Sequence, residues 1–60
     1  MKTYTYLFEY YYHREDEVHA EYEDFDAPTL AEALVKFAIA YPDGRVINTY
    51  VQVNRAGEPV

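Results

Sequence analysis

Residues 29–41, TLAEALVKFAIAY, contain the most regular apolar repeat in the chain. Leu30, Leu34, Phe37 and Tyr41 recur at steps of three or four residues, which places them on one side of an α-helix. This repeat predicts a helix over the whole range. We expect the side that includes Leu30, Leu34 and Phe37 to cover the rest of the fold.

Both ends of the predicted helix are marked by residues that begin or end helices. Thr29 and Glu32 match the capping box, in which a hydroxyl and a carboxylate bind otherwise unpaired backbone amides. Pro28 lies just upstream, where its missing N–H costs no hydrogen bond. Pro42 and Gly44 indicate that the chain turns after the helix, with the glycine available for a positive φ.

A pattern of period two predicts a strand before the helix. Lys2 to Tyr12 is dense in Tyr, Thr and Phe, which are typical of strands. Its even-numbered positions form an aromatic face that consists of Tyr4, Tyr6, Phe8, Tyr10 and Tyr12. The odd-numbered positions form a mixed face that meets water. The polar residues His13 to Asp16 then interrupt the pattern.

Residues Glu17 to Phe25 show the clearest alternation and predict a second strand. Its apolar positions are Val18, Ala20 and Tyr22, and its polar positions are Glu17, His19, Glu21 and Glu23. If the two strands form a hairpin, matching their apolar faces places Phe8 beside Tyr22 and Glu9 beside Glu21. A slip of one residue would exchange the two faces.

The β-branched residues of Arg45 to Asn54 predict a third strand. One side has Ile47, Val51 and Val53, and the other has Val46, Asn48, Tyr50 and Gln52. A right-handed crossover from the second strand to the third leaves the first strand between them. The predicted fold is therefore α+β, with a three-stranded antiparallel sheet in the order 2-1-3 and one helix on one face. We expect a single domain at residues 1–54 and a flexible tail at 55–60.

Composition changes this picture in two ways. The 60 residues include no cysteine, so disulfides do not reinforce the small core, and eight Tyr and three Phe supply most of its area. The formal charge of −6 disfavours direct binding to nucleic acid and favours a basic partner. The N-terminal residues lack the pattern of a signal peptide and no run has transmembrane length, so we expect a cytoplasmic protein without a membrane partner.

Candidate chemistry is limited to His19 among the acids Glu17, Glu21 and Glu23. Side chains at alternate positions of a strand lie about 7 Å apart, and no loop here converges on a cation. A solvated polar face is the favoured interpretation, and a weak cation site is the alternative. The chain has no serine, cysteine or glycine-rich phosphate loop, so we expect no enzyme activity, no metal and no cofactor.

Seven of the eleven acidic residues fall between positions 15 and 26. One interpretation is that they only keep the protein soluble and prevent pairing at a strand edge. The other is that they imitate a nucleic-acid backbone and occupy a basic groove on another protein.

Two further surfaces are predicted to favour association. Val35 and Ile39 form an apolar pair on the side of the helix away from the sheet, where a monomer would leave them in water. The third strand has no charge between Val46 and Val53, so it is an unprotected edge. The candidate dimer interface consists of Val35, Ile39, Val46, Asn48 and Gln52.

The pattern TLAEAL, Phe37 and Tyr41-Pro42, followed by a β-branched strand, resembles the small strand-strand-helix-strand accessory proteins of bacteriophages and mobile elements. Among them, anti-CRISPR and other anti-defence inhibitors resemble the chain in size and acidity. The resemblance implies an inhibitor that binds a host protein and blocks its nucleic-acid site. Residues 17–40 are also similar to the antitoxin of the HicAB toxin–antitoxin pair. Ala31 stands where that family usually has an acid.

The main hypothesis from the sequence is a non-enzymatic acidic inhibitor that binds a basic surface on a host protein. Its predicted binding residues are Glu9, Tyr11, Glu17, Glu21, Glu23 and Tyr50. The alternatives are a homo-oligomeric or structural protein that associates through the third strand or the Val35–Ile39 pair, and a HicB-like antitoxin fragment.

Overall fold

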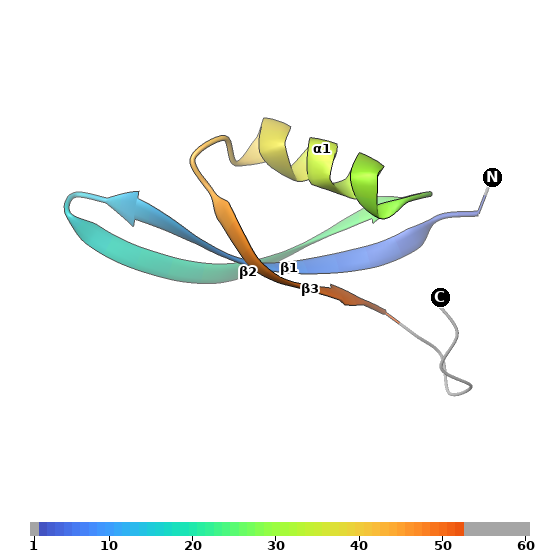
Figure 1. Cartoon of the computed structure of the whole chain (residues 1–60), viewed down its shortest axis with the longest axis horizontal. Coiled ribbons are helices and arrows are strands. Elements are labelled where there is room, and N and C mark those ends of the chain that lie inside the picture. The colour runs from blue at the N-terminus through green and yellow to red at the C-terminus, as the bar shows by residue number, and fades with distance from the viewer. Residues whose placement is uncertain (1, 53–60) are drawn as a thin grey trace.

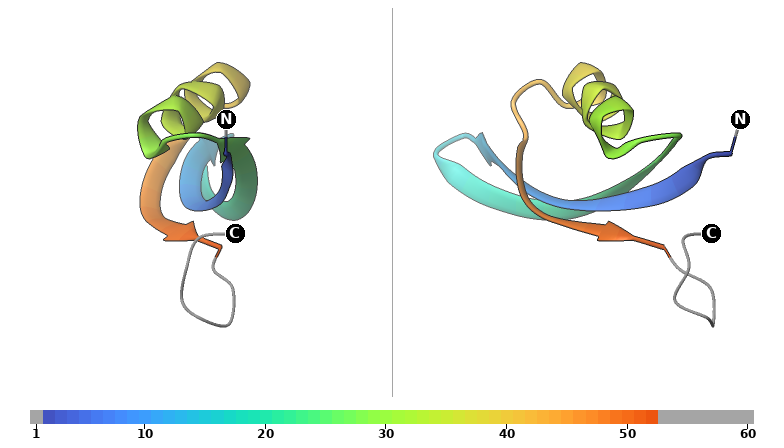
Figure 2. Two further views of the ribbon diagram at one scale, coloured as in Figure 1. Left: turned by 90° about the vertical axis from the view of Figure 1, so that its right-hand side faces the viewer. Right: turned by 45° about the vertical axis from the view of Figure 1, so that its right-hand side comes forward.

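The computed structural model describes residues 2–52, which form three strands and one helix (Figure 1). The elements are β1 (Tyr4–Arg14), β2 (Glu17–Ala27), α1 (Leu30–Ala40) and β3 (Arg45–Val51). The sheet is antiparallel with the order β2-β1-β3, and α1 covers one of its faces (Figure 2). This arrangement confirms the predicted α+β fold. The predicted tail, at residues 55–60, lies outside the described residues.

The helix is one residue shorter at each end than predicted, because Thr29 and Tyr41 are its cap residues. The side-chain oxygen of Thr29 accepts a hydrogen bond from the backbone N–H of Glu32 at 3.2 Å, so one unpaired amide of the first turn is capped. At the other end, the backbone N–H of Tyr41 donates to the carbonyl of Phe37 at 2.8 Å. The N–H of Gly44 then donates to the carbonyl of Tyr41 and closes the turn toward β3.

The β1–β2 turn sets a hairpin register that differs from the predicted one. Glu15 and Asp16 alone connect the strands, and both have positive φ angles, 52° and 65°, as a type I′ turn requires. This short connection pairs Arg14 with Glu17, and the pairing continues to Tyr4 and Ala27. The predicted pairing was wrong by one residue. The prediction matched the apolar faces of the two strands, whereas the length of the turn determines the register.

The slip exchanges the two faces of β2. Tyr6 pairs with Phe25, and Tyr10 pairs with Glu21, so these β2 residues lie on the face covered by the helix. Val18 and Tyr22 instead lie on the open face, where both are well exposed. The prediction that Val18, Ala20 and Tyr22 belong to the core was therefore wrong.

A register shift in β3 corrects the predicted faces of that strand as well. Glu9 pairs with Asn48 but Tyr10 pairs with Val46, which leaves Ile47 as the extra residue of a β-bulge. Val46 therefore lies on the helix side and packs against the core, although we had predicted it on the same side as Asn48. An interrupted period cannot be detected from alternation alone.

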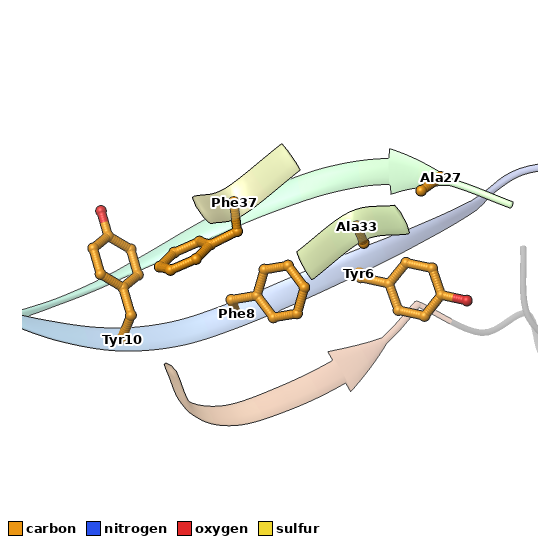
Figure 3. Packing of buried hydrophobic residues seen from close by; sticks show 6 residues of the cluster. All are labelled: Tyr6, Phe8, Tyr10, Ala27, Ala33 and Phe37. Carbon is orange, nitrogen blue, oxygen red and sulfur yellow. The ribbon is translucent and has the colours of Figure 1, made fainter. Parts of the chain in front are cut away.

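The core is small and mostly aromatic (Figure 3). Its buried members are Tyr6, Phe8, Tyr10, Ala27, Ala33 and Phe37. The ring of Phe37 lies edge-on to those of Phe8 and Tyr10, with centroid distances of 5.5 and 5.0 Å. Such pairs contribute about 0.5–1.5 kcal/mol each beyond the area that they bury.

Only part of the predicted apolar stripe on α1 reaches this core. Ala33 and Phe37 are its buried helix residues, whereas Leu30 and Leu34 remain 41% and 39% exposed. The prediction that both leucines are buried against the sheet was wrong. The face of α1 that contacts the sheet is narrower than predicted and centres on Ala33 and Phe37.

Gly44 is required for a different reason from the one that the sequence suggested. Its φ lies outside the left-handed region, but a Cβ at this position would lie 2.8 Å from the Cζ of Phe37 and 3.2 Å from the Cδ2 of Tyr10. The loop after α1 therefore approaches the two rings so closely that only a hydrogen fits between them.

The turn provides a direct test of the hairpin register. Non-glycine residues in the left-handed region carry a steric cost, which is lower for Asn and absent for Gly. We expect the double substitution Glu15→Asn with Asp16→Gly to raise the free energy of unfolding by about 1 kcal/mol, measured by urea denaturation. Glu15→Gln is the control, since it removes a charge and retains the steric cost. A double variant no more stable than the control would contradict the type I′ assignment.

Candidate functional site

The acidic residues that cluster in the sequence occupy one edge of the sheet. β2 is an outer strand, and five of its eleven residues are acidic. We define the acidic edge as these five residues and the two of the adjacent turn, namely Glu15, Asp16, Glu17, Glu21, Glu23, Asp24 and Asp26. Figure 1 shows the turn reaching beyond the C-terminal end of the helix. The acidic edge includes residues from both faces of β2, since Glu21 and Glu23 lie on the helix side and Asp24 lies on the open side.

The predicted binding residues do not share one face. Glu17, Glu21 and Glu23 pair with Arg14, Tyr10 and Phe8, so all three lie on the helix side of the sheet. The predicted placement of these acids on the open face was wrong, and the cause is again the register that the two-residue turn fixes.

Glu9, Tyr11 and Tyr50 do lie on the open face. The carboxylate of Glu9 accepts hydrogen bonds from the hydroxyl of Tyr22 at 3.0 Å and from the side-chain amide of Asn48 at 2.8 Å. The prediction that Glu9 lies beside Glu21 was wrong. Glu9 lies opposite Tyr22 and accepts hydrogen bonds from two neutral donors. The like-charge repulsion that the predicted register implied is absent.

The residues of the predicted dimer interface also separate. Val35 and Ile39 are 58% and 78% exposed, as expected for the side of the helix away from the sheet. Asn48 is exposed but its amide is bound by Glu9, and the backbone N–H of Gln52 donates to the carbonyl of Thr5 at 3.0 Å. Val46, which packs against the core, is not available to a partner in the way predicted.

A row of aromatic rings lies on the helix side of the sheet, next to the C-terminal end of α1. Tyr12 stacks on His19 with a centroid distance of 5.3 Å and on Tyr10 with one of 6.1 Å. Tyr10 in turn lies 5.2 Å from Tyr41, which is the C-cap residue of α1. His19 thus enters an aromatic row on the helix side, and its Nε2 lies 3.6 Å from Glu17.

A pocket of about 360 Å³ opens beside this row. Its walls include Tyr10, Tyr12 and Glu21 from the hairpin and Tyr41 and Asp43 from the chain after α1. The sequence pattern does not indicate this pocket, because it places Tyr10, Tyr12 and Tyr41 only in the core. The available signal was the tyrosine run at 10–12, which extends past the length that one short helix can cover.

Residues 2–52 contain no group of three or more His, Cys, Asp or Glu side chains placed to hold a metal ion. They also contain no helix long and apolar enough to cross a membrane. No family model, curated protein or solved structure matches this chain.

The acids beside the aromatic row change the titration of its tyrosines. Burial, with help from the nearby charges of Tyr41, Glu21 and Glu23, raises the pKa of Tyr10 to about 12. The hydroxyl of Tyr41 donates to Glu23 at 3.0 Å, and this hydrogen bond raises the pKa of Tyr41 above its usual value. On the open face, the hydrogen bond to Glu9 likewise raises the pKa of Tyr22.

These shifts predict a loss of stability in alkali. A phenol whose pKa is higher in the folded state stabilises the fold below its unfolded pKa of about 10. For Tyr10 this contribution is lost as the pH rises from about 10 to about 12. We expect urea denaturation to show falling stability across that interval. The Tyr10→Phe variant should have a flatter curve, and an unchanged slope in that variant would contradict the assignment.

Proposed function

We propose that this protein is a non-enzymatic binding module whose acidic edge docks on a basic surface of another protein. The observation that supports the proposal is the separation of charge between the two edges of the sheet. The acidic edge has seven carboxylates in positions 15–26, whereas β3, at the opposite edge, contains only Arg45 as a charged residue. A solubilising surface has no need of this asymmetry, since charges spread over the molecule serve equally well.

The acids of this edge have few cationic partners among the residues that the structure describes. Among residues 2–52, no Lys or Arg nitrogen lies within 4 Å of a carboxylate oxygen, and His19–Glu17 is the one close pair. Even Lys36 donates to the backbone carbonyl of Asp26 and not to a carboxylate. A basic partner would therefore meet carboxylates that internal ion pairs have not neutralised, which favours fast association and attraction at long range.

The partner that we propose is a host protein whose basic groove normally binds a nucleic acid. Such grooves carry clustered Lys and Arg, and an anionic strand edge suits a groove that follows a phosphate backbone. Alternate residues along β2 place carboxylates about 7 Å apart on each face. Occupation of the groove excludes the nucleic acid, so the proposed role is inhibition, as in the anti-CRISPR proteins that the sequence pattern resembles.

The acidic edge is tested with single-charge variants and an immobilised arginine-rich peptide. We expect Glu17→Gln and Asp24→Asn each to weaken binding by about two- to fivefold, since each removes one exposed charge near the peptide. Raising the salt from about 0.05 M to 0.5 M should abolish most of the binding.

Glu32→Gln is the matched control, because it removes one charge from α1 and leaves the acidic edge intact. Equal losses in all three variants would show that net charge alone drives binding and would contradict a specific role for the edge. Binding that does not depend on salt would contradict the electrostatic basis of the proposal.

A second candidate function is self-association through the helix, favoured by its exposed apolar side chains. Leu30, Leu34, Val35 and Ile39 are all at least 39% exposed. A second copy is the occupant that we propose, because Val35 and Ile39 lie one turn apart on the side of α1 away from the sheet, where the same pair of a second copy can cover them.

Sedimentation analysis tests this candidate at tens of micromolar protein. We expect a dimer whose dissociation constant rises at least about tenfold in Ile39→Glu, because the substitution buries an unpaired charge at the contact. Val18→Glu is the matched control, since Val18 is also exposed but lies on the open face of the hairpin. A monomer at every concentration would exclude the candidate.

A further inference from the structure

The pocket beside the aromatic row lies at the meeting point of the hairpin, the C-terminal end of α1 and the following loop. We propose that it binds an arginine side chain presented by a basic protein. The inference deepens the proposed function, on which it rests for the identity of the partner. The observation behind it is that aromatic faces, carboxylates and a helix C-terminus converge on one cavity.

The aromatic walls suit a planar cation. Tyr10, Tyr12 and Tyr41 all line the cavity, and the Tyr10 ring is held between the other two at centroid distances of 6.1 and 5.2 Å. Tyr12 is also fixed from the other side by His19 at 5.3 Å. These contacts hold the rings in place before a ligand arrives. The negative face of such a ring attracts a cation, most often the guanidinium of arginine.

The charges around the cavity favour the same ligand. Glu21 and Asp43 both line it, the first from β2 and the second from the loop after the helix. Ala40 and Tyr41 bring the C-terminal end of α1 to the wall, and the last turn of that helix contains no basic residue. The partial negative charge of a helix C-terminus is stabilised by a nearby cation, which this chain does not supply from the helix itself.

Arg14 is the one lining residue with the opposite charge. It stands at the end of β1, is exposed, and among the described residues makes no ion pair within 4 Å. Two carboxylates and the helix terminus outweigh its single charge. Arg14 therefore weakens the binding of a cation, but the cavity still favours a cation over an anion. Removal of the Arg14 charge should tighten the binding of a cation, which is a direct test of the proposal.

Arginine fits these surroundings better than lysine. A guanidinium can stack its flat face on a tyrosine ring while its edge donates hydrogen bonds to a carboxylate, whereas an ammonium group acts as a point charge. The cavity has both elements, since the rings of Tyr12 and Tyr41 line it together with Glu21.

Nuclear magnetic resonance titration with a capped Ala-Arg-Ala peptide tests the proposal. We expect saturable shifts in Tyr12, Tyr41 and Gly44, with weaker shifts for the lysine peptide and none for the neutral citrulline peptide. Glu21→Gln should weaken binding by about three- to tenfold. Tyr12→Leu should weaken it similarly while retaining an apolar wall, and Arg14→Gln should tighten it by about two- to fivefold.

Equal binding of the arginine and citrulline peptides, absence of saturable shifts, or weaker binding in Arg14→Gln would each overturn the proposal. The arginine-rich peptide separates this failure from failure of the acidic edge. Loss of its binding in Glu17→Gln and Asp24→Asn, but not in Tyr12→Leu, would retain the edge and exclude the pocket. The converse pattern would retain the pocket and exclude the edge.

Discussion

The two-residue connection at Glu15 and Asp16 is the constraint on which the rest of this structure depends. Because both residues have positive φ, they connect β1 and β2 by a tight two-residue turn. The pairing of the two strands then continues without a break to Tyr4 and Ala27. That pairing decides which β2 residues face the helix. Phe25 and Ala27 enter the core, and Glu21 and Glu23 lie beside the tyrosines of β1 and the helix C-cap. Both the core and the candidate pocket are consequences of one short turn.

Tyrosine allows this register to be stable despite placing acids next to the core. Its ring fills the apolar interior, and its hydroxyl reaches the boundary with water, where it donates to a carboxylate. Tyr41 does this with Glu23, and Tyr22 does so with Glu9 on the open face. A phenylalanine in either place would leave the carboxylate without that donor. The eight tyrosines therefore let this short chain pack an aromatic core directly beside acidic side chains.

The features predicted correctly from the sequence are those that neighbouring residues determine. Thr29 caps the helix by accepting from the backbone N–H of Glu32, and alternation in Tyr4 to Tyr12 depends only on the strand itself. Strand order also followed, since a right-handed crossover leaves few choices. The hairpin register and the bulge at Ile47 were missed, because turn length and backbone pairing settle them and apolar periodicity does not. The clustering of acids was visible in the sequence, but their division between two faces depended on the missed register.

The two edges of the sheet differ in charge. This difference makes the two proposed interactions, with a basic partner and with a second copy, compatible. Carboxylates along β2 repel a second copy of the same edge, so strand pairing between two copies through β2 is disfavoured. The exposed apolar residues of α1 and those of β3, whose one charged residue is Arg45, lie away from this repulsion. A homodimer formed through the helix would therefore leave the acidic edge accessible. Two acidic edges in one assembly would then bind an extended basic surface more tightly than one, through effective concentration and without new contacts.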